Sequence, residues 1–346
     1  MKKLSYKQSG VDIAAADLFK GKIKALVKKS QSQSVLGGIG GFGSMFAFPQ
    51  KDYKNPVLVS SSDGVGTKLK IAALANKHDT VGIDAVAMNV NDILCVGAKT
   101  LFFLDYIAYS KLQEDVLLDI VKGLNAGCLQ AACALIGGET AQMPGMYKPG
   151  DYDLAGFCVG VVEKNEIIDG SKIEPGNAVI GLESNGLHSN GFSLARKVLS
   201  IPEQKRMAKE LLRPTRIYVK PILSLLSQGH KVSAQASTEG TMSQVKGIAH
   251  ITGGAFYDKI ARILPDNVNV RINKSAWPVP NIFKLIQLKG GIEDREMYHT
   301  FNMGVGMVLI VEAEFAREIV LKLSGMKLKS WIIGKVVKGK KEVEVV

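Results

Sequence analysis

The sequence predicts a protein of two domains in which buried strands alternate with helices. Its 346 residues are enough for two domains of roughly 100–200 residues each. The apolar, β-branched run Val57–Ser60 is typical of a buried strand, and Leu69–Ala75 then restarts as a helix. The polar stretch Asp169–Gly176 contains a proline and marks a boundary. We therefore predict an N-terminal domain over residues 1–170 and a C-terminal domain over residues 171–346.

The remaining elements follow from the same patterns. Further strands are expected at Thr100–Tyr109, Ala134–Gly137, Asp153–Glu163, Ala178–Glu183, Ile248–Ile251 and Met307–Glu312. Helices are expected at Leu18–Lys29, Asp79–Val96, Val116–Cys133, Phe192–Leu199, Leu211–Leu226 and Ala255–Leu264. The polar stretch Gly229–Gln244 is expected to form an exposed loop, and the tail Lys335–Val346, which alternates lysine with valine, an edge strand.

Composition excludes several classes of protein. Hydrophobic residues make up 46% and charged residues 22% of the chain, as in ordinary soluble proteins. No apolar run reaches the ~18 residues of a membrane span, and no apolar segment of a signal peptide follows the basic start. The four cysteines form no C-x-x-C pair, which disfavours a zinc site or a disulfide framework. We therefore expect a protein of a reducing compartment with no membrane partner.

The net charge of +12 raises the question of nucleic acid as a partner. Only eight of the 44 basic residues are arginine, and none precedes Arg196. Arginine is the residue preferred for hydrogen bonds to base edges and for bidentate hydrogen bonds to phosphates. We interpret the lysine excess as a solvated surface that also attracts small anions, and we expect no nucleic-acid partner.

The stretch from Asp63 to Lys68, Asp-Gly-Val-Gly-Thr-Lys, gathers a carboxylate, a hydroxyl and an ammonium group on one turn. The two glycines allow a sharp bend or a close approach to a ligand. This set suits a metal-bound polyphosphate, with Asp63 on Mg²⁺, Thr67 on phosphate oxygens and Lys68 supplying charge. An ordinary Asp-Gly turn beside a solvated lysine stays the alternative.

A second glycine-rich segment spans Gly37–Ser44, with five glycines in seven residues. Such a loop forms no stable helix or strand. It can wrap the phosphates of a nucleotide or act as a lid, although a plain linker fits the pattern as well. The lysines of Leu18–Lys29 are expected on a solvated helix face, from which one of them can reach an active site.

Further acids and histidines occupy positions typical of a site. Asp92 lies inside an apolar run, where a carboxylate is costly unless it is paired or binds a metal. Glu139 follows two glycines just beyond an expected strand. Thr252-Gly253-Gly254 precedes an expected helix, whose first amides can bind a phosphate. His188 and His250 are candidates for proton transfer, but a lone histidine is often structural.

Several of these motifs occur together in one order. They include Asp63–Lys68, Asn91-Asp92, Gly137–Ala141, Met143–Tyr147, Ser189–Gly191, Pro214–Tyr218, His250–Gly254 and Phe301–Met307. The set resembles that of the phosphoribosylformylglycinamidine cyclo-ligase family, also called aminoimidazole ribonucleotide synthetases. The resemblance runs from about Tyr6 to the C-terminal strands and therefore covers nearly the whole chain.

The resemblance implies a cytoplasmic ligase of purine biosynthesis that uses ATP and Mg²⁺. ATP activates the amide oxygen of formylglycinamidine ribonucleotide as an iminophosphate, and the amidine nitrogen closes onto the same carbon. The products are aminoimidazole ribonucleotide, ADP and phosphate. The implied fold is α/β (α+β), with an N-terminal sheet that forms a dimer barrel in a homodimer and a C-terminal α/β sandwich.

The resemblance also implies roles for individual residues. Nucleotide binding falls to Lys24, Gly40, Gly41, Gly43, Asp63, Gly64, Gly66, Thr67, Lys68 and Asn91. Mg²⁺ is expected on Asp63, Asp92 and Glu139, and the substrate phosphate on Thr252, Gly253 and Gly254. Catalytic roles fall to His188, His250 and Lys68. One departure from the family pattern is Ala255, which replaces a usual third glycine after Thr252.

Other functions remain open at this stage. Thiamine-phosphate kinases, selenophosphate synthetases and hydrogenase-maturation dehydratases share parts of the pattern. The chain has neither a reactive N-terminal cysteine nor a terminal cysteine, which argues against the last two. A catalytically inactive binding protein is disfavoured because all three acids are present.

Overall fold

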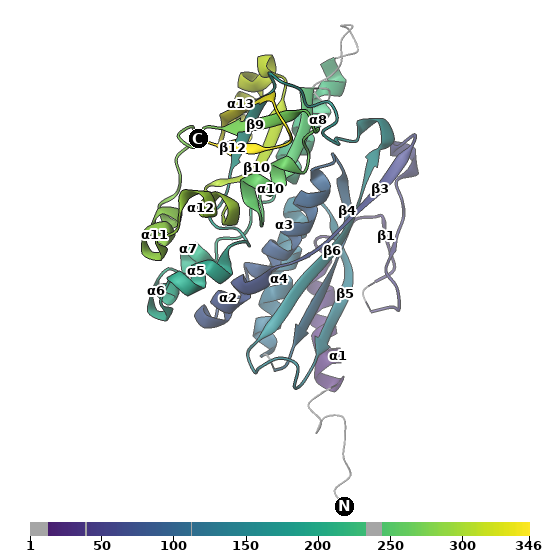
Figure 1. The fold of residues 1–346 in the computed structure, drawn as a ribbon. Coiled ribbons are helices and arrows are strands. Elements are labelled where there is room, and N and C mark those ends of the chain that lie inside the picture. Colours follow the sequence, from purple (N-terminus) through teal and green to yellow (C-terminus); the bar gives the residue numbers. More distant parts are fainter. Residues whose placement is uncertain (1–12, 39, 112, 233–243) are drawn as a thin grey trace, which may run out of the picture.

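The computed structural model describes residues 13–38, 40–111, 113–232 and 244–346. It contains a four-stranded sheet of order β3-β6-β4-β5, a six-stranded sheet of order β12-β9-β11-β7-β10-β8 and a two-stranded ribbon of β1 (Val35–Leu36) and β2 (Met45–Phe46). Figure 1 shows the two larger sheets in separate halves of the molecule, each with its own helices. Strands thus alternate with helices, as predicted, in a mixed α/β fold.

The four-stranded sheet consists of β3 (Pro56–Gly64), β6 (Tyr152–Glu163), β4 (Lys99–Tyr109) and β5 (Ala134–Gln142). The pair β4–β5 is parallel and is joined through α4 (Glu114–Ala131), whereas β6 is antiparallel to both of its neighbours. β3 and β5 extend further than predicted, so Asp63 and Glu139 lie within strands rather than on loops beyond them. Pairing with β6 and β4 overrides the weak strand propensity of the glycines there.

Helices α3 (Val81–Leu94) and α4 cover the inner face of this sheet. A Cβ atom on Gly82 would lie 2.2 Å from the backbone nitrogen of Leu124, so only glycine allows the two helices to pack this closely. α1 (Ile13–Val27) lies along α4, and α2 (Leu69–Ala75) follows the short 3-10 turn Gly66–Lys68.

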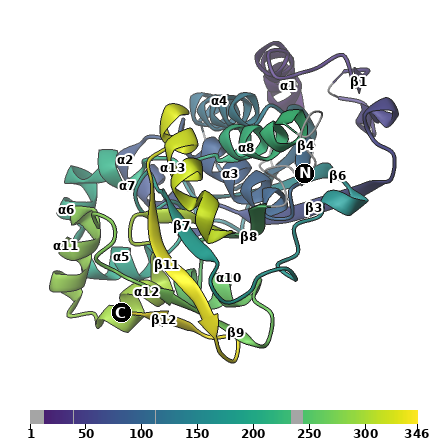
Figure 2. The same cartoon turned by 90° about the horizontal axis from the view of Figure 1, so that it is seen from above.

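The six-stranded sheet belongs to the second half of the chain. Its strands are β7 (Ala178–Glu183), β8 (Val245–His250), β9 (Val268–Ile272), β10 (Val305–Val311), β11 (Ser330–Lys338) and β12 (Val343–Val345). Its helices are α5 (Phe192–Val198), α6 (Ile201–Arg206), α7 (Ala208–Leu211), α8 (Val219–Val232), α10 (Ala255–Ala261), α11 (Asn281–Gly290), α12 (Asp294–Thr300) and α13 (Ala316–Gly325). In Figure 2, α8 and α13 lie side by side over this sheet.

Three predictions for this half need correction. The helix predicted over Leu211–Leu226 is interrupted, because α7 ends at Leu211, before Pro214, and α8 starts only at Val219. The loop predicted over Gly229–Gln244 begins later, since α8 continues to Val232; residues 233–243 lie outside the described residues. In the tail only Val343–Val345 forms an edge strand, whereas Lys335 belongs to the interior strand β11.

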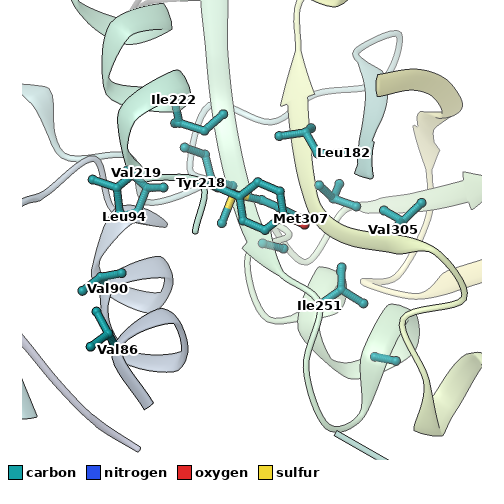
Figure 3. Close-up of a cluster of buried hydrophobic side chains, with 14 of the residues drawn as sticks. Val86, Val90, Leu94, Leu182, Tyr218, Val219, Ile222, Ile251, Val305 and Met307 are labelled. Atoms are coloured by element: carbon teal, nitrogen blue, oxygen red, sulfur yellow. The ribbon is translucent and has the colours of Figure 1, made fainter. Parts of the chain in front are cut away.

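A shared apolar core joins the two halves (Figure 3). Val86, Val90 and Leu94 on α3 face the side chains of Tyr218, Val219 and Ile222 around the start of α8. Leu182, Ile251, Val305 and Met307 continue this cluster into the six-stranded sheet. The cluster fixes α3 between the sheets, so side chains on α3 are held against loops of the second half. In the described parts of the chain, no helix is long and apolar enough to cross a membrane.

Candidate active site

A cavity of about 740 Å³ lies beside the edge strand β5. We call it the β5 cavity; its walls come from α1, the segment Gly40–Ser44, the end of β4, the start of α4, and β5 itself. This volume lies within the roughly 300–1,000 Å³ of ordinary small-molecule sites. The cavity can therefore hold a ligand of the size of a nucleotide.

The predicted glycine-rich segment lines this cavity, and Lys24 lies beside one of its glycines, Gly40. A Cβ atom on Gly40 would lie 3.3 Å from the Nζ atom of Lys24, and Gly40 has a φ of +110°. Gly41 and Gly43 are exposed, and Ser44 donates a 2.8 Å hydrogen bond to the carbonyl oxygen of Ile136. The ammonium group and the flexible backbone are thus held beside β5, where both can meet an anion.

Glu139 also lines the β5 cavity, but it lies far from the other two predicted metal ligands. Asp63 on β3 is the register partner of Gly156 on β6. Gly156 is in turn the partner of Asp105 on β4, and Asp105 is the partner of Gly138 on β5. Three strand spacings, about 14 Å, separate Asp63 from β5. Because successive side chains of a strand point to opposite faces, Glu139 lies on the face of the sheet opposite Asp63. The prediction that Asp63, Asp92 and Glu139 surround one ion is therefore wrong within a single chain.

Asp63 and Asp92 are neighbours across β3 and α3, because Nδ2 of Asn89, one helical turn before Asp92, donates to the carbonyl oxygen of Asp63 over 3.1 Å. Partial burial raises the pKa of Asp63, and the negative charge of Asp92 raises it further. Two neighbouring carboxylates favour a cation between them, and Mg²⁺ accepts one or two protein carboxylates together with phosphate oxygens. These two residues fit an Mg²⁺ site on their own, although no group of three or more acids, histidines or cysteines within the described ranges could hold a metal ion.

His250 connects Asp92 to the second half of the molecule. Its Nδ1 atom lies 2.8 Å from Oδ1 of Asp92, and its Nε2 atom lies 3.4 Å from Nδ2 of Asn91. If the Asn91 amide donates to Nε2, the proton of a neutral His250 ring sits on Nδ1 and points at Asp92. His250 is buried, whereas 44% of the Asp92 side chain is exposed. The histidine therefore orients a carboxylate that faces solvent.

Asn91 is fully buried and makes contacts of its own across the two halves. Its Nδ2 atom donates to the carbonyl oxygen of Arg216 over 2.8 Å, and its Oδ1 atom accepts from the amide of Tyr218 over 3.0 Å. Because its amide group is occupied by the protein backbone, the structure places Asn91 between the halves rather than facing a ligand.

Lys68 is also completely buried, against its predicted role on a phosphate. Its Nζ atom donates to Oδ1 of Asp84 over 2.9 Å and to the carbonyl oxygens of His188 and Arg213 over 2.9 and 2.7 Å. Burial lowers the pKa of Lys68, and Asp84 opposes that shift. All three ammonium hydrogens are used within the protein, so Lys68 ties the loop after β3 to the second half.

The sequence reasoning missed Asp84. Its Oδ1 atom also accepts from the backbone amide and the hydroxyl of Thr215, each over 2.7 Å, and from the hydroxyl of Ser189 over 3.1 Å. Asp84 is an acid inside the apolar run that forms α3, the same signal that drew attention to Asp92. That signal could have identified it as a buried, paired carboxylate.

His188 has a structural environment. It is buried, has a φ of +63°, and its Nε2 atom accepts from the amides of Asn185 and Arg216 over 3.0 and 3.4 Å. Burial lowers the pKa of His188, and the nearby charges of His250, Lys68 and Arg216 act in the same direction. The ring is therefore neutral and holds the loop after β7.

The loop from Gly64 to Thr67 meets the second half at α5. Gly64 lies within β3, and Gly66 has a φ of +70° with open space around it. Thr67 is exposed, and its hydroxyl lies 3.1 Å from the hydroxyl of Ser193. Gly66 and Thr67 are the exposed residues of the Asp63–Lys68 motif, whereas Val65 between Gly64 and Gly66 is buried.

The turn Thr252–Gly254 lies at the start of α10. Gly254 has a φ of +81°, and Ala255, the departure from the family pattern, has a strained φ of +38°. A Cβ atom on the exposed Gly253 would lie 3.4 Å from Oδ1 of Asn190, so this turn adjoins the loop Ser189–Gly191 before α5. Two predicted motifs distant in sequence thus meet on one surface.

Comparison with known proteins agrees with this architecture. The family model described as AIR synthase related protein, N-terminal domain, matches residues 52–162, and the corresponding C-terminal model matches residues 174–243 and 231–346. The phosphoribosylformylglycinamidine cyclo-ligase of Carboxydothermus hydrogenoformans is 50% identical over 99% of both chains. That of Geotalea daltonii is 52% identical over 97% of this chain and 96% of its own.

Solved structures share the fold at low identity. A thiamine-monophosphate kinase of Stenotrophomonas maltophilia has a TM-score of 0.63 at 16% identity over 94% of both chains. A hydrogenase maturation protein HypE, solved in complex with ATP, has a TM-score of 0.65 at 15% identity over 97% of this chain and 92% of its own. These similarities establish the two-domain fold alone. Because relatives at least 50% identical match nearly its whole length, the chain belongs to the phosphoribosylformylglycinamidine cyclo-ligase family.

Proposed function

We propose that this protein catalyses the ATP-dependent cyclisation of formylglycinamidine ribonucleotide to aminoimidazole ribonucleotide, with release of ADP and phosphate. The observation that carries the proposal is the β5 cavity, which has the volume of a nucleotide site and is lined by the glycine-rich segment, with Lys24 beside Gly40. Membership of the cyclo-ligase family supplies the identity of the second substrate.

Within this proposal, the nucleotide occupies the β5 cavity. Lys24 and the exposed backbone of Gly40, Gly41 and Gly43 bind its phosphates, since an ammonium group and free amides offer positive charge to them. Asp63, three strand spacings from β5, and Asp92 would hold Mg²⁺, which when bound would neutralise negative charge on a transferred phosphoryl group there. Glu139 lies on the face of the four-stranded sheet opposite Asp63, and we assign it to the rim of the nucleotide site.

The substrate lies where the two halves meet. The turn Thr252–Gly254 and the loop Ser189–Gly191 form the surface on which its ribose phosphate is bound. His250 holds Asp92 in place through the 2.8 Å hydrogen bond, and the exposed Thr67 faces the same boundary. Holding both reactants in one geometry can supply about 7–11 kcal/mol of the barrier.

We also propose a homodimer formed through the outer face of the four-stranded sheet. Leu58, Tyr106 and Phe157 lie on three of its strands and are 63%, 41% and 40% exposed. An uncovered apolar sheet face of this kind is typical of an interface. Pairing two such faces would cover them and would enclose Glu139, which is the register partner of Tyr106.

The proposal is tested by measuring ADP release from the purified protein with MgATP. Formylglycinamidine ribonucleotide should stimulate ADP release, and thiamine phosphate should not. The gene should also restore growth without purines to a bacterial strain that lacks this cyclisation step. Stimulation by thiamine phosphate alone would identify a kinase and overturn the proposal.

A further inference from the structure

Asp105 is a carboxyl group in the β5 cavity to which neither the family motifs nor the proposed chemistry gives a role. It lies in the middle of β4, opposite Gly138 on β5. A Cβ atom on Gly138 would lie 2.4 Å from Oδ1 of Asp105, so the carboxyl group lies over the glycine. The absence of a side chain at position 138 is what makes room for the Asp105 carboxyl beside the edge strand.

The surroundings of Asp105 are mostly apolar. The cavity walls include Phe19, Ile23, Val27, Leu117, Val121 and Leu135, from α1, α4 and β5. The glycine-rich segment, by contrast, is exposed. A polyphosphate would be repelled by a half-buried acid in apolar surroundings, whereas a flat, uncharged base fits between such walls. The part of a nucleotide that reaches Asp105 is therefore its base.

Charged and titratable groups approach Asp105 from each neighbouring element. Glu139 on β5 and Cys128 on α4 interact with it electrostatically, and Tyr109, Lys111 and Glu114 line the same cavity. Burial, and then the charge of Glu139, raise the pKa of Asp105 to about 7. Its own backbone amide is the hydrogen-bond donor that reaches it among the described residues. Near neutral pH the Asp105 carboxyl group is thus available both to accept and to donate a hydrogen bond.

We propose that Asp105 recognises the base of the bound nucleotide, accepting a hydrogen bond from the exocyclic amine of adenine and donating one to the adjacent ring nitrogen. This inference rests on the proposed function, in which the β5 cavity holds ATP. The donated hydrogen bond requires the neutral carboxyl group, because an ionised carboxylate has no hydrogen to donate and repels the lone pair of the ring nitrogen. Binding of the adenine base should therefore weaken as the pH rises through neutrality.

The test compares the wild-type protein with Asp105→Asn and Asp105→Ala, using Mg²⁺ and ADP in titration calorimetry at pH 6.5 and 8.5. Asparagine offers the same acceptor and donor as a neutral carboxyl group but does not titrate. The affinity of the wild type should fall by about 10- to 30-fold between these pH values, since each pH unit above the pKa removes about tenfold of the neutral form. Asp105→Asn should lose this fall and should show only the change in the opposite direction that comes from ionisation of the ADP phosphate, which strengthens its binding to cations as the pH rises.

A second ligand, purine riboside diphosphate, lacks the exocyclic amine. The wild type should prefer ADP over it, and Asp105→Ala should lose that preference. The control variant is Asp119→Asn, which removes a charge from the exposed side of α4, where Asp119 pairs with Lys122, and should behave as the wild type does.

An equal fall in affinity in the wild type and Asp105→Asn would overturn the inference, as would an unchanged preference for ADP in Asp105→Ala. These outcomes differ from failure of the proposed function. In that case the wild type itself would bind no ADP and would show no turnover with formylglycinamidine ribonucleotide, and both proposals would fall together.

Discussion

Replacing Lys68 with methionine should destabilise the protein strongly rather than merely weaken nucleotide binding. Lys68 and Asp84 are both fully buried, and the ammonium group donates to one carboxylate and two carbonyl oxygens at 2.7–2.9 Å. Methionine fills a similar volume but leaves Asp84 as an unpaired buried charge. Removing one partner of such a pair typically costs about 3–5 kcal/mol of the free energy of unfolding.

The chain offers a matched control two residues away. Lys70 pairs with Asp151 over 2.6 Å, but 48% of the Lys70 side chain is exposed. Lys70→Met should therefore change the free energy of unfolding by no more than about 1 kcal/mol. Urea unfolding, followed by fluorescence of the buried Trp277 and by circular dichroism, measures both variants.

A double variant distinguishes the loss of the ion pair from the loss of side-chain packing. In the double variant Lys68→Met with Asp84→Leu no buried charge remains, so part of the lost stability should return. If Lys68→Met lowered the free energy of unfolding by as little as Lys70→Met does, the structural role of Lys68 would be refuted. If that variant also raised the KM for ATP, Lys68 would be a phosphate ligand, as the sequence alone predicts.

Three further predictions concern the site and its assembly. Asp92→Asn should lower kcat by at least ~100-fold in the ADP-release assay, because a group that holds the metal is lost, and near-wild-type turnover at saturating Mg²⁺ would argue against the assignment. Gly138→Ala should weaken ADP binding in calorimetry, since the added Cβ would lie 2.4 Å from the Asp105 carboxyl; unchanged affinity would show that the side chain moves freely. Phe157→Asp should yield a monomer in analytical ultracentrifugation, because a charge is placed on the exposed apolar sheet face, and an unchanged sedimentation coefficient would contradict the proposed interface.

Local patterns in the sequence were enough to locate most elements and several site motifs. The glycine-rich segment and Lys24 do meet at a cavity, and Asp63 and Asp92 do lie together. Periodicity predicted α3 and α4 closely because both bury a continuous apolar stripe. It predicted β3 and β5 too short, because only pairing with neighbouring strands draws Asp63, Gly138 and Glu139 into the sheet.

Properties that depend on distant contacts were not visible in the sequence. The motif Asp63–Lys68 reads as one ligand-binding turn, yet the structure exposes Thr67 and buries Lys68 against Asp84, sixteen residues later. Glu139 resembles a metal ligand by its position after two glycines, but strand register and side-chain alternation place it on the face opposite Asp63. Strand order, the face on which a side chain lies and its burial depend on contacts throughout the fold, so a short motif does not reveal them.

In the proposed reaction ATP activates the amide oxygen of the substrate, so that this oxygen leaves with the phosphate. The direct measurement uses formylglycinamidine ribonucleotide carrying ¹⁸O in that amide group, and mass spectrometry of the inorganic phosphate formed in a single round of turnover. Each phosphate released should carry the label, with one ADP and one aminoimidazole ribonucleotide formed alongside it. Unlabelled phosphate, or ADP formed without the ring product, would contradict it.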